Sequence, residues 1–326
     1  MVNLTQKLAC IVLATLLPLG LSLAGEPTSA DLVKALNNAF GRPHPDGMRA
    51  AHPKGICVAG QFSPAASAGE FSSTPALKAG TYPVIGRFSL AGGNPQASDL
   101  TTPRGLALDI ALPEGGPFNL VMINSPKFPV ATPTEFVQML EKVAAQRQAA
   151  SEAPEVDKPE TPTIKPISST SFTSAPYFAV HTFYFATADG NQPARWVFEP
   201  TAGRENMDVE AAQALDDANN YLIPELKERM AAGPSRWDIY LQLPEADDEL
   251  NNATIAWPEE RERIAVGHLV LDRVIEPGSA DDCAKKMFNP LALPSGVTPA
   301  DDPILKARPG AYGVSLSRRL MPVAQQ

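Results

Sequence analysis

Cysteine and histidine are scarce in this chain, whose 326 residues include three cysteines and four histidines. The cysteines form no CxxC pair and the histidines form no HExxH motif, which argues against a structural or hydrolytic zinc site. A GxSxG nucleophile elbow, a P-loop and a GxGxxG fingerprint are also missing. Serine hydrolases, P-loop nucleotide hydrolases and dinucleotide-binding enzymes therefore have no local signal in this sequence.

Basic residues are outnumbered as well, with 27 lysines and arginines against 36 aspartates and glutamates, a net charge of −9. Because neutralising phosphates dominates affinity for nucleic acids, this balance argues against DNA or RNA as a partner. Hydrophobic residues make up 44% of the chain and charged residues 19%, the proportions of a folded protein. Proline is abundant, at 33 residues, which favours turns over long helices.

One long hydrophobic run is present, at the N-terminus. Residues 8–23 are almost wholly apolar, Lys7 precedes them, and residues 22–24 (Ser-Leu-Ala) have the small-x-small pattern of a cleavage site. These features predict a signal peptide over residues 1–24 and a single mature domain over residues 25–326. A retained membrane anchor is the alternative, but the run is shorter than the ~20 apolar residues of a spanning helix. We therefore expect export to the periplasm and no stable membrane association.

Two cysteines remain after cleavage, Cys57 and Cys283. Oxidising compartments favour disulfides, but pairing also depends on the distance between the two Cα atoms, which the sequence does not give. The sequence alone therefore does not decide between a disulfide and two free thiols.

Short alternating segments predict most of the fold. Eight strand-like runs are separated by turns, and the Ala-Asp-Gly-Asn turn at residues 188–191 is typical of a hairpin. This pattern predicts an antiparallel barrel or sandwich. The runs are Val58–Phe62, Val84–Leu90, Gly105–Leu112, Phe118–Asn124, Tyr177–Thr187, Arg195–Glu199, Trp237–Leu243 and Ala265–Val274.

Helices are fewer. Residues 132–135 (Thr-Pro-Thr-Glu) are a capping box with proline at the first helical position, which predicts a helix to about Gln148. Residues 149–176 are rich in proline, serine and threonine and are interpreted as an irregular excursion, because strand patterns continue on both sides. The other candidate helices are Asp208–Asn219, Pro224–Ala232 and Leu305–Arg319.

Four separated segments combine into a specific pattern. They are residues 48–55 (MRAAHPKG), 86–89 (GRFS), 102–107 (TPRGLA) and 308–312 (RPGAY). In this order and spacing the chain resembles the heme catalases and their shorter relatives, the catalase-related peroxidases, over residues 36–319. The resemblance implies an α+β fold, a catalase-like antiparallel β-barrel of about eight strands with surrounding helices. It also implies a heme b cofactor with ferric iron and an enzyme that acts on peroxide.

Tyr312 is the residue expected to bind the heme iron. A phenol normally ionises only near pH ~10, so it is a poor ligand at neutral pH unless its anion is stabilised. Arg308 lies four residues earlier, on the same face of a helix, where its charge would stabilise the phenolate. A surface Arg–Tyr pair is the commoner origin of this spacing, but the resemblance favours the ligand role, because tyrosine is a recognised axial heme ligand.

The resemblance assigns His52 and Ser89 to the opposite face of the heme. A neutral imidazole can move a proton between the two peroxide oxygens, and the Ser89 hydroxyl would bind its other ring nitrogen. The structural alternatives are a histidine that caps a loop and a hydroxyl that faces solvent. The other residues implied to bind the cofactor are arginines for its propionates and aromatic residues of the pocket: Arg49, Arg87, Arg319, Phe128 and Phe136.

The two remaining groups of positions are less specific. His181 matches a supporting histidine near the tyrosine side of the heme, whereas His44 and His268 are expected to be exposed without a role. Ile123 stands where heme catalases carry a distal asparagine, and Ala51 stands where they carry a valine that narrows the channel. Both differences favour peroxidase over catalase activity.

We therefore expect a heme peroxidase that reduces hydrogen peroxide with an organic electron donor and has weak catalase activity at most. Organic hydroperoxides are a further substrate class. The resemblance does not extend to the N-terminal arm and C-terminal helices of large catalases, so we expect a monomer or small homo-oligomer. A heme enzyme that rearranges fatty-acid hydroperoxides and an exported, non-enzymatic heme-binding protein remain as alternatives.

Overall fold

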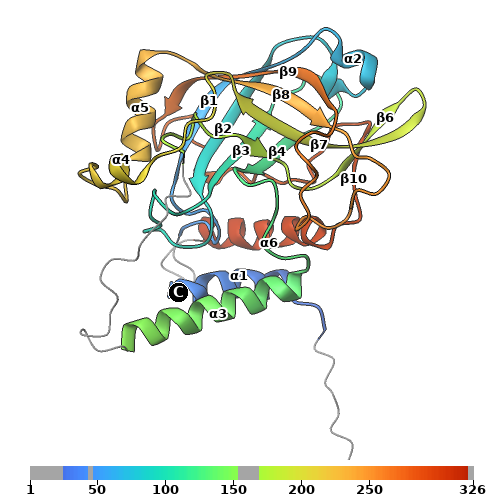
Figure 1. Ribbon diagram of the computed structural model, residues 1–326. Coiled ribbons are helices and arrows are strands. Elements are labelled where there is room, and N and C mark those ends of the chain that lie inside the picture. Colours follow the sequence, from blue (N-terminus) through green and yellow to red (C-terminus); the bar gives the residue numbers. More distant parts are fainter. Residues whose placement is uncertain (1–24, 43–46, 153–168, 322–326) are drawn as a thin grey trace, which may run out of the picture.

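An antiparallel β-barrel forms the centre of the fold in the computed structural model, which describes residues 25–42, 47–152 and 169–321 (Figure 1). Eight strands close the ring in the order β7-β5-β4-β3-β2-β1-β9-β8, and β8 pairs back with β7. The predicted barrel of about eight strands is confirmed, and the sandwich is excluded. The strands are β1 (Gly55–Pro64), β2 (Tyr82–Leu90), β3 (Arg104–Ile110), β4 (Phe118–Ile123), β5 (Tyr177–Phe178), β7 (Gly190–Pro200), β8 (Ser235–Gln242) and β9 (Arg263–Ile275).

Large aromatic side chains fill the interior of the barrel. Phe88, on β2, stacks on Phe172 with their ring centroids 5.1 Å apart, and it also contacts Tyr177 and Trp237 at about 6 Å. All four side chains are fully buried. Alternate residues of each strand supply this core, as the period of two in the sequence predicts. Because the barrel is packed solid, a site for a large ligand must lie outside it.

A layer of three helices lies along one side of the barrel (Figure 1). These helices are α1 (Ser29–Ala39), α3 (Pro133–Glu152) and α6 (Pro303–Leu320), and α1 packs against both of the others. The predicted capping box opens α3, where the Thr132 hydroxyl accepts a hydrogen bond from the Glu135 amide at 3.2 Å. No helix of the described residues is both long and apolar enough to cross a bilayer. The predicted signal peptide and His44 lie outside the described residues.

Three local predictions need correction. The helix predicted over Asp208–Asn219 is only the short α4 (Val209–Gln213). The strand predicted over Tyr177–Thr187 breaks into β5 and β6 (Phe183–Thr187), because His181 and Thr182 are fully buried and bond elsewhere, to Asp302 and Arg195. The elements that were not predicted include α1, the short α2 (Ala68–Phe71) and β10 (Val297–Pro299), which extends the sheet beyond β6.

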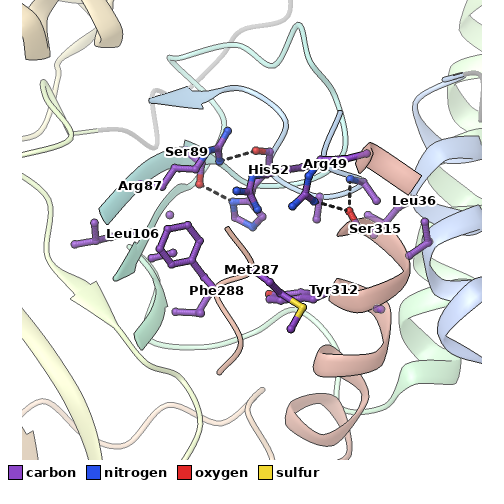
Figure 2. Close-up of a pocket in the computed structure, with 18 of the residues that line it drawn as sticks. Leu36, Arg49, His52, Arg87, Ser89, Leu106, Met287, Phe288, Tyr312 and Ser315 are labelled. Atoms are coloured by element: carbon purple, nitrogen blue, oxygen red, sulfur yellow. Dashed lines mark hydrogen bonds between the residues drawn. The ribbon is translucent and has the colours of Figure 1, made fainter. Parts of the chain in front are cut away.

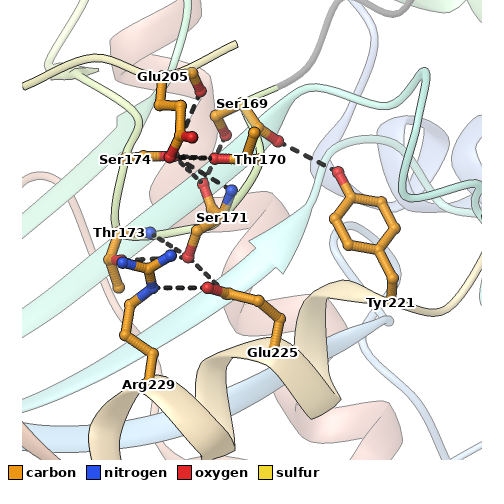
Figure 3. Close-up of polar contacts among 9 residues, drawn as sticks. All are labelled: Ser169, Thr170, Ser171, Thr173, Ser174, Glu205, Tyr221, Glu225 and Arg229. Atoms are coloured by element: carbon orange, nitrogen blue, oxygen red, sulfur yellow. Dashed lines mark hydrogen bonds and ion pairs between the residues drawn. The ribbon is translucent and has the colours of Figure 1, made fainter. Parts of the chain in front are cut away.

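The prediction of an irregular segment over residues 149–176 is wrong for residues 149–152, which continue α3 and are exposed, whereas residues 169–176 are irregular, as predicted, and mostly buried. Hydroxyl groups fasten the latter residues to α5 (Leu222–Ala232) and to the turn before that helix (Figure 3). Ser171 Oγ donates to Glu225 Oε2 at 2.6 Å, and Tyr221 Oη donates to the Ser169 carbonyl at 3.1 Å. Side-chain hydrogen bonds thus replace the strand ladder that this segment lacks.

Candidate active site

Two adjoining cavities lie between the barrel and the helix layer. The larger, of about 500 Å³, has mostly apolar walls contributed by α1, α3 and α6. The smaller, of about 100 Å³, contains three arginines (Figure 2). His52 and Tyr312 line both cavities. The two cavities therefore form one slot that is apolar at one end and cationic at the other, with the histidine and the tyrosine between them.

His52 lies in the loop before β1 in an unusual backbone conformation. Its φ of 56° is the only positive φ at a non-glycine residue of the described chain. This left-handed conformation is unfavourable for a residue with a Cβ, and such residues cluster at functional sites. Hydrogen bonds hold it: the His52 amide donates to the Gly92 carbonyl at 2.6 Å, and Arg87 Nη1 donates to the His52 carbonyl at 2.8 Å.

The imidazole of His52 is oriented by Ser89, the penultimate residue of β2. His52 Nδ1 lies 2.9 Å from Ser89 Oγ (Figure 2). Burial, and after it the positive charges of three nearby arginines, lower the pKa of His52 to about 3. The imidazole is therefore neutral at neutral pH, with one ring nitrogen fixed by the strand hydroxyl and the other free for a ligand.

Tyr312 approaches the slot from α6, on the side opposite the barrel. Arg308, one helical turn earlier, donates from Nη2 and Nε to Tyr312 Oη at 2.7 and 3.1 Å. The helix runs through Pro309, which lacks an amide hydrogen and so leaves one helical hydrogen bond unmade. Two charge-assisted donors on one phenol oxygen are the arrangement that stabilises a phenolate.

His181 fixes the start of the helix that carries Tyr312. Asp302, the N-cap of α6, accepts hydrogen bonds from the amides of Ile304 and Leu305 and lies 2.7 Å from His181 Nδ1. Burial lowers the pKa of His181 to about 4 in spite of the Asp302 carboxylate, whereas the pKa of Asp302 is lowered because these hydrogen bonds outweigh its burial. Neutral His181 thus donates Nδ1–H to an ionised Asp302.

Arg49, Arg87 and Arg319 line the smaller cavity together. Burial, and then mutual repulsion, lowers the pKa of Arg49 to about 9 and that of Arg87 to about 10. None of the three forms an ion pair with a carboxylate in the part of the chain that the structure describes. The Asp282 carboxylate attracts Arg49 and Arg87 but does not offset their burial and mutual repulsion, so this end of the slot favours an anionic ligand.

The slot therefore fits a heme on the chemistry of its donors. A flat, largely apolar ring would contact the apolar walls, and carboxylates on one edge would meet the arginines. Phe128 and Phe136 line the larger cavity, with their ring centroids 6.0 Å apart. A tyrosine held by an arginine on one face and a neutral histidine on the other suit a ferric iron and its substrate.

Ile123, the residue expected to replace the distal asparagine of heme catalases, lines the slot in the structure. Ile123 and Ala51 line the larger cavity, whereas Asn124 Oδ1 accepts a hydrogen bond from the Arg104 amide at 2.8 Å and lines neither cavity. No asparagine or glutamine occurs among the described residues that line the slot. The larger cavity is thus mostly apolar, and its polar lining residues are His52, Ser125, Lys127, Arg308 and Tyr312.

Two features of the site were not assigned from the sequence. Gly105, on β3, lies beside both Ser89 and His52 and leaves room for their contact. A glycine inside a strand pattern is a usable signal for such a close approach. Cys57 and Cys283, whose pairing the sequence left open, form a disulfide with Cα atoms 5.8 Å apart.

His268 is exposed, as expected, and its Nδ1 lies 2.8 Å from Asp238 Oδ1.

Sequence comparisons point to a single family. The catalase family profile matches residues 166–326. A catalase-related peroxidase of Synechococcus elongatus is 32% identical, over 98% of this chain and 95% of its own length. A second catalase-related peroxidase, from Mycolicibacterium paratuberculosis, is 27% identical over 84% of this chain and 89% of its own length.

Solved structures share the fold. A fungal catalase superposes with a TM-score of 0.69, and catalase A from Saccharomyces cerevisiae with a TM-score of 0.68, each at 19% identity over 86% of this chain. The chain covers 60% and 62% of these two catalases, so it spans about three fifths of their length.

Proposed function

Because the chain belongs to the catalase-related peroxidases, peroxide-acting oxidoreductases of the catalase family, we propose that it reduces hydrogen peroxide on a heme b held between His52 and Tyr312. An organic donor would return the electrons. The observation that carries this proposal is the pairing of a half-buried, neutral histidine with an arginine-bound tyrosine across one slot. Heme, when bound, supplies the ferric iron that accepts the oxidising equivalents of the peroxide.

Tyr312 would bind the iron through Oη, and Arg308 would hold that oxygen as its anion through two hydrogen bonds. The arginine cluster at the other end of the slot would bind the propionates. Phe128 and Phe136 would cover the ring with apolar surface and exclude water.

His52 would move the proton that peroxide cleavage requires. Its Nδ1–H donates to Ser89 Oγ in the tautomer that leaves Nε2 free, so Nε2 takes a proton from one peroxide oxygen and returns it to the other. The low pKa of His52 supports this role, because the imidazole is unprotonated, and so able to accept a proton, at neutral pH.

The walls of the slot support a preference for peroxidase over catalase chemistry. Without a distal amide beside His52, a second peroxide molecule has one polar group fewer to orient it, so catalase activity would be weak at most. The apolar cavity beside Ala51 and Ile123 would admit organic hydroperoxides as a further substrate class.

The mature protein would act in the periplasm after removal of residues 1–24. The Cys57–Cys283 disulfide supports an oxidising compartment, because disulfides persist there and are rare in the cytosol. The acidic net charge of −9 supports a protein without nucleic-acid partners. We propose a monomer or small homo-oligomer without stable membrane association.

Two other functions use the same slot. The apolar cavity of about 500 Å³ favours a heme enzyme that rearranges fatty-acid hydroperoxides without a donor. An exported heme-binding protein without activity is the second alternative, but the strained His52 held by Ser89 argues against it, since binding alone needs no proton shuttle.

Product analysis separates the three. A lipid hydroperoxide and, in parallel, hydrogen peroxide are each incubated with the hemin-loaded protein, with and without an aromatic donor such as guaiacol. The peroxidase predicts an alcohol product only when donor is present and consumed. Rearranged product without donor would establish the first alternative, and unchanged hydroperoxide and hydrogen peroxide in both reactions would establish the second.

A further inference from the structure

The arginine end of the slot is closed by residues 282–288, here called the strap. Met287 and Phe288 of the strap line the smaller cavity together with Arg49 (Figure 2). The Arg49 guanidinium lies over the Phe288 ring, with Cζ 5.8 Å from the ring centroid. The strap is therefore part of the wall that an anionic ligand would meet.

Backbone carbonyls of the strap hold two of the three arginines. Arg49 Nη2 donates to the carbonyls of Cys283 at 2.8 Å and Lys286 at 3.0 Å. Arg319 Nη2 donates to the same Lys286 carbonyl at 3.3 Å. Neither arginine forms an ion pair with a carboxylate of the described residues, and Arg319 Nη1 also donates to Ser315 Oγ at 3.2 Å. The position of the Arg49 guanidinium therefore depends chiefly on these carbonyls, and that of Arg319 depends on them in part.

The strap is in turn fixed by the Cys57–Cys283 disulfide. Cys283 is fully buried, and the bond joins residues 226 positions apart in the sequence. Cys57, on β1, pairs directly with Arg87, on β2, so the bond ties the strap to the strand pair that carries the third arginine. Phe288 packs in the same apolar cluster as Cys57 and Cys283, and the ion pair of Lys286 with Asp109, between half-exposed groups, contributes little.

We propose that the Cys57–Cys283 disulfide is a positioning element for the arginine cluster: by fixing the strap it sets how tightly the slot binds the carboxylates of its ligand. This inference rests on the proposed binding of heme. It does not make either cysteine a catalytic residue, because the disulfide acts through Arg49 and Arg319. Its effect is specific to the carboxylate end of the ligand, which distinguishes positioning from a general contribution to stability.

The test compares hemin with hemin dimethyl ester, whose carboxylates are blocked, by absorbance titration. The wild-type protein is expected to prefer hemin by at least about tenfold, the effect of one charge-assisted contact. The double variant Cys57→Ser/Cys283→Ser is expected to keep its affinity for the ester and to lose most of this preference. The matched control is Ile239→Ala, which opens a cavity in the barrel interior, away from the slot, and is expected to keep the preference.

A second route covers the case in which the double variant fails to fold. Folded wild-type protein is treated with dithiothreitol, which is oxidised to its cyclic disulfide as the protein disulfide becomes two thiols, and alkylation confirms the opening. The preference for hemin is again expected to fall. An unchanged preference in the folded double variant or in the opened protein would overturn the inference. Wild-type protein that binds neither ligand would instead overturn the proposed function, and this inference with it.

Discussion

The imidazole of His52 lies directly against the backbone of Gly105. A Cβ at position 105 would be 3.0 Å from His52 Nδ1 and Cε1 and 2.9 Å from Ser89 Oγ. Gly105 pairs with Ser89 between β3 and β2, so the strand ladder itself brings the glycine under the histidine–serine contact. The barrel thus contributes to the site through Gly105, which has no side chain, as well as through the Ser89 hydroxyl.

Substitution Gly105→Ala should lower peroxide turnover at least about tenfold while hemin still binds, because the added methyl group must displace His52 or Ser89 from their 2.9 Å contact. Steady-state assays and hemin titration measure the two effects. Gly69→Ala is the matched control, because a Cβ there meets only the Leu77 carbonyl at 3.9 Å. Equal turnover in wild type and Gly105→Ala would contradict this role.

Removal of the proton shuttle gives the largest effect on turnover. His52→Ala should retain hemin but lose roughly 10²- to 10⁴-fold in peroxide turnover, the usual contribution of a general acid–base group. Ser89→Ala should cost less, because it loosens the ring without removing it. His268→Ala, on an exposed residue, serves as the control for loss of a histidine. Turnover unchanged by His52→Ala would refute the assignment.

Acid stability should depend on the two buried histidines. The pKa of His52 is about 3 and that of His181 about 4, both lowered chiefly by burial from 6.5. Between these values and about pH 6.5 the unfolded chain binds protons that the folded chain does not. The free energy of unfolding from this source therefore rises with pH and is complete above about pH 6.5.

Denaturant unfolding from pH 4 to pH 7 measures this dependence. His52→Gln, which removes one of the two groups, should flatten the curve over that range. Wild-type activity should show no step near pH 6.5, since His52 is neutral throughout. An activity step there that disappears in His52→Gln would show an ordinary, solvated histidine.

Restoring an amide in the distal pocket should raise catalase activity. Ile123→Asn would place a polar side chain in the apolar cavity, and one hydrogen bond to a peroxide is worth about 1 kcal/mol, or roughly five- to tenfold in rate. An oxygen electrode measures the change. Ile123→Ala, which enlarges the pocket without an amide, is the control, and an equal rise in both variants would assign the effect to space alone.

The fold was largely predictable because alternate residues of the barrel strands enter one core, although β1 and β2 are buried on both faces over part of their length. The sequence pattern located all eight ring strands, and the capping box located the start of α3. The helix α1 was missed although Thr28 and Asp31 form a capping box too. The break between β5 and β6 depends on long-range contacts of His181 and Thr182, and β10 has only three residues, so neither leaves a periodic signal.

The resemblance identified the residues of the slot, but it did not give the distances and contacts between them. Each of the predicted positions Arg49, His52, Arg87, Ser89, Phe128, Phe136, Arg308, Tyr312 and Arg319 lines one or both cavities. Their roles stay predictions. The disulfide, the Gly105 contact and the tie between His181 and Asp302 join segments far apart in the chain, where sequence spacing carries no distance.

The most direct test of heme binding through Tyr312 is the absorption spectrum of the purified mature protein after expression with hemin. The wild-type protein is expected to show a Soret band with the charge-transfer pattern of high-spin ferric heme bound to phenolate, and Tyr312→Phe a weakened or altered spectrum. No stable heme spectrum, or the same spectrum in wild type and Tyr312→Phe, would contradict heme binding through Tyr312.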